Sequence, residues 1–476
     1  MARHETAALG ARVAHYGPAP AQAEPAAPGA APDQQRRPWW YFWVWLVTPH
    51  NEFGAIYIGM IVVLFLDMSL GQALLGLVLG NAAGALSHGI LTARGVHLRS
   101  PQITLGRKYF GHTGNMVLTT VIALVSSYGW FIVNSLVAAL ALQTIFDLPV
   151  VAGLAITVAV QLLLAWSGVD FKQLQRYLFP LVAVMLVIAG IMIFAQVTPA
   201  HDPGSPWNLS GLIAVVVVAC FAWAYSIGWN IYSTDYSRYA PTTSPKIAGI
   251  ASSVGLFVSS MLLMSIGVAA GIMVIGDDSS NPTQQFSSLL PSGFGTAVMV
   301  FVVLGAWSAN AIALHSSNHL FSAGGLDVST WGRRLMGPFV VSVLGFLLGW
   351  WAEGDLAGNY EGYVMALGYW VAPWLNVALV DYRLRRKMDD PTSELYEQDL
   401  SPKWGLFAVG FGLLGSLCLY ALQVFDGGGL PHGGVSYAVL GMLVGFYLSG
   451  AIYGFGLKRM LKSRPAAAGA ETSGAE

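Results

Sequence analysis

The chain is poor in charge. Asp, Glu, Lys and Arg together make up only 10% of its 476 residues, whereas hydrophobic residues make up 55%. Soluble domains carry about 25% charged residues, so this composition excludes an ordinary soluble domain and indicates that lipid covers the apolar faces. The net charge is −1, which gives no reason to expect a nucleic acid as partner. We expect no obligatory protein partner either.

Cysteine is nearly absent as well, and no catalytic motif is present. The two cysteines, Cys220 and Cys418, lie within apolar runs, so neither a disulfide nor a metal site is expected. The sequence has no GxxxxGK[ST] phosphate loop and no GxSxG nucleophile motif. We therefore expect no enzyme activity, no catalytic residue, no metal ion and no cofactor.

The few charges that are present alternate in sign along the chain. The basic residues form clusters separated by apolar sequence long enough to cross a bilayer twice, and the loops between two such crossings carry acidic residues. Basic residues stay on the cytoplasmic side because translocating them is costly. This alternation predicts about twelve transmembrane helices in the plasma (inner) membrane, with both termini cytoplasmic. The basic clusters are Arg3–Arg37, Arg94–Lys108, Lys172 with Arg176, Arg238 with Lys246, Arg333 with Arg334, Arg383–Lys403 and Lys458–Arg464, and the acidic residues are Asp147, Asp202, Asp277, Asp278, Glu353, Asp355 and Asp426.

A transmembrane helix needs about 20 apolar residues, and this length defines the candidate spans. We interpret residues 1–38 as a disordered cytoplasmic tail, 39–457 as one transmembrane domain and 458–476 as a cytoplasmic C-terminal tail. The spans are 39–67, 70–94, 115–144, 148–168, 173–197, 209–233, 246–275, 291–314, 333–352, 360–383, 404–425 and 435–457.

The first and sixth spans contain polar interruptions. Thr48–Gly54 interrupts the first, and Tyr225–Asn230 interrupts the sixth. Irregular backbone is tolerated at membrane depth only where protein or a water-filled cavity covers it. Two interruptions five spans apart fit two five-helix repeats of inverted topology with a binding site at midplane. Close helix packing is the alternative explanation of such residues.

Trp130 and Asn134 are four residues apart in the third span and share one helix face. A planar heterocycle needs a ring to stack on and an amide to read its edge, and this pair offers both. A core tryptophan with an interhelical asparagine is the simpler interpretation. Asn51, Tyr225, Ser226, Trp229 and Asn310 are further candidates for substrate binding, from the first, sixth and eighth spans.

Glu52 lies within the interruption of the first span. An ionisable residue at membrane depth is a functional candidate, so Glu52 and Ser308 of the eighth span are candidates for ion coupling. A structural pair between Glu52 and a neighbour such as His50 remains open.

Several segments resemble the nucleobase–cation symporter family, which includes permeases for cytosine, purines, uracil, thiamine, allantoin and hydantoin. The Trp-Phe-x-x-Asn form in the third span is most similar to the cytosine–purine branch. The segments are Leu79–Gly84, Phe110–Asn115, Gly129–Asn134, Gly228–Tyr239 and Gly368–Trp374 with Asp381.

The resemblance implies an all-α, LeuT-like fold with ten helices in two inverted repeats and two more helices at the C-terminal end. It implies that Trp130 stacks on the substrate and that Asn134 and Asn310 bind it. Two departures stand out: Ser226 occupies a position where the family often has an aromatic residue, and Ser308 is followed by Ala309 where sodium-coupled members have a second hydroxyl. The second departure favours proton over sodium coupling.

The sequence thus predicts a secondary-active symporter that imports a nucleobase, cytosine or purine, or a related heterocycle by alternating access and is driven by protons. A permease of the same fold for allantoin, hydantoin, thiamine or another small solute, with sodium as a possible coupling ion, is the alternative. A channel or a membrane sensor is a third hypothesis, against which the interrupted helices count.

Overall fold

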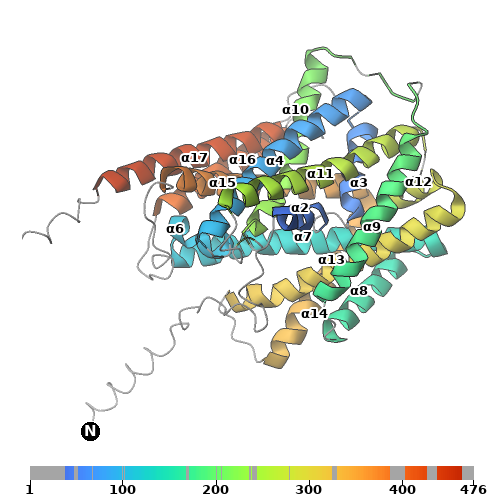
Figure 1. Cartoon of the computed structure of the whole chain (residues 1–476), viewed down its shortest axis with the longest axis horizontal. Helices are drawn as coiled ribbons and strands as arrows, with labels where there is room; N and C mark the ends of the chain where they lie inside the picture. Colours follow the sequence, from blue (N-terminus) through green and yellow to red (C-terminus); the bar gives the residue numbers. More distant parts are fainter. Residues whose placement is uncertain are drawn as a thin grey trace, which may run out of the picture.

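The structure, a computed structural model, is all-helical over the residues it describes (Figure 1). These residues are 38–47, 52–66, 68–98, 100, 102–167, 171–199, 201–204, 206–234, 237, 244–277, 279–323, 330–385, 403–425 and 437–463.

The first half of the chain runs from α2 to η2. Its elements are α2 (Pro38–Val47), α3 (Phe53–Leu64), α4 (Leu70–Leu98), α5 (Gln102–Leu105), α6 (Arg107–Phe110), α7 (His112–Phe146), α8 (Val150–Ser167), α9 (Phe171–Phe194), α10 (Leu209–Gly228) and η2 (Trp229–Tyr232).

The second half runs from α11 to α17. Its elements are α11 (Pro245–Met273), α12 (Pro282–Ser288), α13 (Ser292–Ala323), α14 (Thr330–Ala352), η4 (Glu353–Asp355), α15 (Leu356–Arg385), α16 (Lys403–Phe425) and α17 (Tyr437–Ser463).

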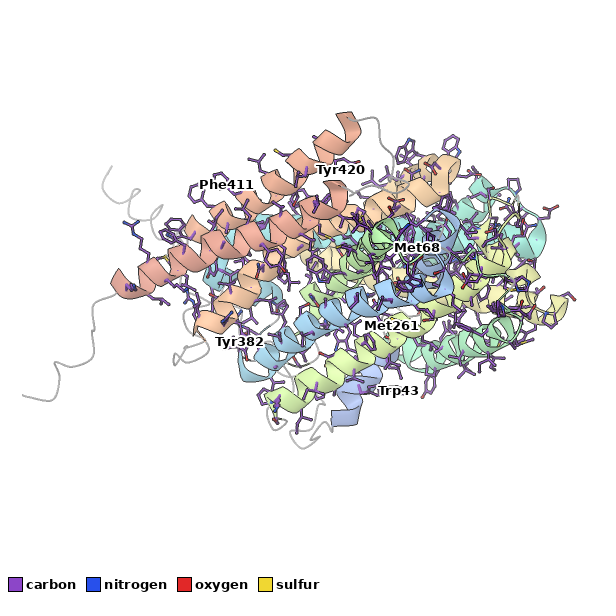
Figure 2. The ribbon with its side chains drawn as sticks, turned by 90° about the horizontal axis from the view of Figure 1, so that it is seen from above. Trp43, Met68, Met261, Tyr382, Phe411 and Tyr420 are labelled. Atoms are coloured by element: carbon purple, nitrogen blue, oxygen red, sulfur yellow. The ribbon has the colours of Figure 1, made fainter. Side chains whose placement is uncertain are left out.

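Nine helices of the described part of the chain are long and apolar enough to cross a membrane. Two shorter apolar helices, Phe53–Leu64 and Val150–Leu164, accompany them. The predicted all-helical membrane architecture is therefore confirmed, whereas the exact number of twelve spans stays a prediction. The outer surface fits a lipid environment, since Phe411 and Tyr420 on α16 point outward (Figure 2) and are 51% and 45% exposed.

Both predicted interruptions separate distinct helical elements. α2 ends at Val47 and α3 begins at Phe53, with Glu52 in the N-cap position and in an extended conformation (φ −114°, ψ 119°). α10 ends at Gly228 and continues as the 3₁₀ helix η2. A 3₁₀ turn at the end of a helix tightens the backbone and changes its side-chain directions, so these two points can carry polar side chains into the interior.

Small residues let the helices around α3 approach closely. A Cβ added to Gly59 of α3 would collide with the backbone of Met264 on α11, and one added to Gly267 would collide with the backbone of Ile56. Such contacts are typical of membrane helix interfaces. α11 packs against α2, α3 and α4, while α13 packs against α7. In Figure 1, α16 and α17 lie together on one side of the molecule, and α8 and α14 lie at its lower edge.

Candidate functional site

A buried carboxylate lies at the beginning of α3. Glu52 is 6% exposed and Asn134 of α7 is 2% exposed. Asn134 donates a hydrogen bond from Nδ2 to Glu52 Oε1 at 3.3 Å. Within the described part of the chain, Glu52 Oε2 and Asn134 Oδ1 are buried without a hydrogen-bond partner. The pair therefore leaves two acceptor oxygens in the protein interior.

Aromatic side chains surround Trp130, one helical turn before Asn134. The Trp130 indole lies nearly parallel to that of Trp229 from η2, with 6.5 Å between the ring centroids and 19° between the planes. Tyr225 of α10 and Tyr363 of α15 meet Trp130 edge-on, with centroid distances of 5.4 and 5.5 Å. The interruption of the sixth span thus places two aromatic rings against the third.

Two tyrosines of α15 fix the position of this aromatic group through hydrogen bonds to α3 and α7. The hydroxyl of Tyr360 donates to the Gly54 carbonyl at 3.0 Å, and that of Tyr363 donates to the Ser126 carbonyl at 3.0 Å. The first bond connects α15 to the first turn of α3, where the helix resumes after the interruption. A Cβ at Gly129 would collide with the Tyr363 ring, so glycine is needed there for α15 to approach α7.

Ser226 faces α4. Its hydroxyl donates to Asn81 Oδ1 at 2.6 Å, and Asn81 Nδ2 in turn donates to the sulfur of Met264 at 3.2 Å. Gly84 makes room for this contact, because a Cβ there would collide with the Cβ of Ser226. In this conformation Ser226 joins α10 to α4, and its neighbour Tyr225 is the residue that meets Trp130.

Asn310 of α13 joins α13 to α7. Its Nδ2 donates to the Phe131 carbonyl at 2.9 Å and to Ser135 Oγ at 3.0 Å. These contacts lie one residue further along α7 than Trp130 and Asn134, and therefore on the neighbouring face of the helix. Ser308 is buried on the same helix.

The structure therefore brings five of the predicted site residues into one region: Glu52, Trp130, Asn134, Tyr225 and Trp229. It places Ser226 and Asn310 at helix contacts beside that region. Asn51 lies outside the described residues.

Tyr360 and Tyr363 were not predicted as site residues from the sequence. Their spacing of three residues puts both hydroxyls on one side of α15, and that signal could be read from the sequence. His88 was not predicted as a site residue either; its Nδ1 lies 3.2 Å from Asn230 Oδ1, and its ring meets that of Trp45 edge-on at 4.0 Å. This contact links α2 and α4 to η2, the element that carries Trp229.

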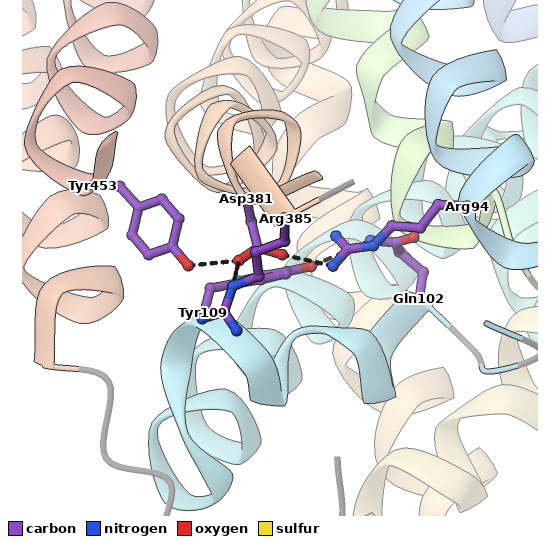
Figure 3. Close-up of polar contacts among 6 residues, drawn as sticks. All are labelled: Arg94, Gln102, Tyr109, Asp381, Arg385 and Tyr453. Atoms are coloured by element: carbon purple, nitrogen blue, oxygen red, sulfur yellow. Dashed lines mark hydrogen bonds and ion pairs between the residues drawn. The ribbon is translucent and has the colours of Figure 1, made fainter. Parts of the chain in front are cut away.

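A second buried carboxylate, Asp381 of α15, lies in a cluster of charged and phenolic groups (Figure 3). Arg94 of α4 reaches Asp381 Oδ2 at 2.6 Å, and Arg385 lies 2.9 Å from Oδ1. Tyr453 of α17 donates to the same Oδ1 at 2.8 Å. Buried charges require such partners because desolvation is otherwise uncompensated. The cluster joins α4, α15 and α17 at one end of the molecule.

Comparison with known proteins identifies relatives over most of the chain. Residues 32–404 match the family described as permease for cytosine/purines, uracil, thiamine, allantoin. The chain is 25% identical over 328 residues to the putative purine-cytosine permease YxlA of Bacillus subtilis, covering 67% of this chain and 70% of YxlA. It is 22% identical over 404 residues to the purine-cytosine permease FCY21 of Saccharomyces cerevisiae, covering 80% and 72%. These relatives are permeases and not enzymes.

The fold is similar to that of Mhp1. The TM-score is 0.69 against the inward-facing conformation of Mhp1, at 18% identity and covering 90% of this chain and 91% of Mhp1. It is 0.66 against the closed conformation with bromovinylhydantoin bound, at 16% identity and covering 90% and 93%. Mhp1 is a nucleobase-cation-symport-1 family transporter. The match over residues 32–404 means that the chain belongs to the family of permeases for cytosine and purines, uracil, thiamine and allantoin.

Proposed function

We propose that this protein is a secondary-active symporter that imports cytosine, a purine or a related heterocycle by alternating access, driven by protons. The observation that carries this proposal is the aromatic and polar region around Trp130, Trp229, Asn134 and Glu52. A flat aromatic enclosure with one polar end suits a flat substrate with hydrogen-bonding groups on its edge.

The two indoles support a stacking role. A ring inserted between two others needs about 7 Å, twice the contact distance of about 3.5 Å between carbon atoms. The Trp130 and Trp229 centroids are 6.5 Å apart and their planes are nearly parallel. The gap between the two planes is at most this centroid distance, so η2 would have to move away from α7 to admit one planar ring between them. Tyr225 would close the edge of the same space.

Glu52 supports proton coupling. It is a buried carboxylate that has no cationic partner among the described residues, and a carboxylate can carry one proton between two conformations. A hard metal cation would need several oxygen ligands, and the described neighbours of Glu52 include one amide and several phenols. Ser308 is kept as a secondary candidate for ion coupling.

Ser226, Asn310 and Asn51 complete the proposed substrate site. The polar groups of Ser226 and Asn310 hold neighbouring helices together in this conformation. They would have to exchange these partners for the substrate during the transport cycle. Asn51 precedes Glu52 in the interruption between α2 and α3.

The proposed topology has twelve spans in the plasma (inner) membrane, with α16 and α17 following ten helices of two inverted repeats. Residues 1–38 and 458–476 form cytoplasmic tails and 39–457 the transporter domain. The meeting of Arg94, Arg385 and Tyr453 at Asp381 supports this orientation, because it places ends of α4, α15 and α17 on one side, where basic residues collect.

A hydantoin or allantoin permease, or one for thiamine or another small solute, is the second candidate, with sodium as an alternative ion. Two observations favour it: Mhp1 has been captured with bromovinylhydantoin, and Ser226 stands where an aromatic residue is often found in the family.

Uptake of labelled cytosine into proteoliposomes tests the proposal. Proton and sodium gradients are imposed separately, and adenine, hypoxanthine, uracil, allantoin, hydantoin and thiamine are added as competitors. We expect saturable, proton-driven uptake that cytosine or purines inhibit, with counterflow from preloaded vesicles. Inhibition by allantoin, hydantoin or thiamine alone would favour the second candidate, and flux without saturation or counterflow would indicate a channel.

A further inference from the structure

We propose that Glu52 and Asn134 together recognise one polar edge of the substrate. Loss of the proton from Glu52 rotates the Asn134 amide by about 180°, and the positions of its hydrogen-bond donor and acceptor are then exchanged. This inference rests on the proposed function and adds a specificity mechanism to it. In this mechanism the protonation state of Glu52 determines which pattern of hydrogen-bond donors and acceptors the site binds on the substrate.

The two side chains hold each other in place. Asn134 Nδ2 donates to Glu52 Oε1 at 3.3 Å, and no other hydrogen bond is recorded for either side chain in the described part of the chain. Asn134 Oδ1 and Glu52 Oε2 are buried and unpartnered there. Although Glu52 is the N-cap residue of α3, its side chain makes no capping bond. The orientation of the amide thus depends on Glu52.

The protonation state of Glu52 decides which end of the amide faces it. An ionised carboxylate only accepts hydrogen bonds, so the NH₂ group of Asn134 must face it. A protonated carboxyl can donate to the amide oxygen, and the amide then turns over by about 180°. The terminal torsion of asparagine is broad and roughly two-fold, so its rotamer preference does not oppose either orientation.

A turned amide reads a different substrate edge. Cytosine and adenine present a bare ring nitrogen, an acceptor, beside an amino group, a donor. Uracil and hypoxanthine present a ring N–H, a donor, at the same position beside a carbonyl, an acceptor. For a ring held in one orientation by Trp130 and Trp229, each orientation of Asn134 matches one edge and opposes the other.

Proton release thereby becomes coupled to substrate release. When Glu52 is protonated, the amide orientation matches the transported base and two hydrogen bonds form. When the proton leaves, the amide turns and sets donor against donor and acceptor against acceptor, and buried unmatched polar groups are costly. A proton and a substrate that favour the same state increase each other's affinity, as symport requires.

Among the described residues, the titratable groups that face Glu52 are phenols. Tyr225 of α10 and Tyr360 and Tyr363 of α15 lie near Glu52, and Tyr57 of α3 stacks on Tyr360. The other ionisable groups described on α4, α7 and α11 lie elsewhere. On α4, His88 contacts Asn230 and Arg94 pairs with Asp381. On α7, Tyr128 packs against Phe131, and His112 of α7 and Lys246 of α11 lie in the first turns of their helices.

Equilibrium binding to the purified full-length protein in nanodiscs tests the inference. The probes are two isosteric pairs, cytosine with uracil and adenine with hypoxanthine, each measured at acidic and alkaline pH. We expect cytosine and adenine to bind more tightly at acidic pH and uracil and hypoxanthine at alkaline pH, with changes of roughly tenfold or more in Kd, as expected for two exchanged hydrogen bonds. Glu52→Gln cannot lose a proton and should bind all four probes independently of pH.

Two variants complete the design. Asn134→Ala should keep stacking but bind the two members of each pair with similar affinity. Glu353→Gln removes an exposed carboxylate of η4 and should behave as the wild type. Affinities that shift in the same direction for all four bases, or pH dependence that survives in Glu52→Gln, would overturn the inference. Inverted preferences, with uracil and hypoxanthine favoured at acidic pH, would keep the amide reversal but remove the amino bases as substrates. No binding of any nucleobase at either pH would contradict the proposed function itself.

Discussion

Two buried carboxylates in this protein have opposite surroundings. Asp381 is fully buried and contacts Arg94, Arg385 and the Tyr453 hydroxyl. Glu52 is almost as deeply buried, yet its described neighbours offer one amide bond and no cation. A buried charge with matched partners is locked, because separating it from them exposes each to the desolvation penalty. A buried carboxyl without such partners is free to exchange a proton, which is what a transport cycle requires.

The largest difference should appear when each carboxyl is replaced by its amide. Asp381→Asn leaves Arg94 buried and Arg385 partly buried without a carboxylate, and we expect a loss of about 3–5 kcal/mol in stability, the usual cost of breaking a buried ion pair. Glu52→Gln removes no ion pair among the described residues, and we expect its stability to change by less than about 1 kcal/mol. Thermal unfolding in detergent measures both, and equal destabilisation would contradict the comparison.

Trp130→Ala should nearly abolish uptake, and because the ring is buried it should also lower the thermal midpoint. Base–aromatic stacking contributes about 1–3 kcal/mol per base, so we expect an affinity loss of up to roughly a hundredfold. Trp130→Phe keeps a smaller ring and should retain intermediate uptake. Expression level and thermal midpoint serve as controls, and wild-type uptake by Trp130→Ala would remove the stacking role.

Glu52→Gln should also uncouple transport from the proton gradient. The variant retains a hydrogen-bonding group of the same shape, so exchange of substrate across the membrane should persist. Accumulation against a concentration gradient should be lost, because no proton is carried. Counterflow and proton-driven uptake in the same vesicles separate the two, with Glu353→Gln as the matched control. Proton-driven accumulation at the wild-type level in Glu52→Gln would exclude Glu52 as the coupling residue.

The sequence predicted the elements of this site better than its side-chain directions. Polar interruptions in apolar spans mark the breaks after α2 and α10, because irregular backbone is rare at membrane depth. The direction of Ser226 could not be predicted, since each successive residue turns by about 100° around a helix and both Tyr225 and Ser226 were plausible. Tyr360 and Tyr363 were missed because their partners, Gly54 and Ser126, are more than two hundred residues away.

The smallest effects should come from single hydroxyls in the two regions. Tyr453→Phe removes one hydrogen bond to Asp381, which keeps both arginines, and should cost about 1 kcal/mol in stability with little effect on uptake. Tyr360→Phe removes the bond to the Gly54 carbonyl and should cost a similar amount. It should also lower transport, because Gly54 lies two residues from Glu52 at the beginning of α3. Thermal unfolding and uptake, measured on both variants, distinguish the two regions. An equal loss of transport in both variants would mean that the two regions act as one unit. The difference between the ion-paired carboxyl of Asp381 and the exchangeable carboxyl of Glu52 would then have no functional meaning.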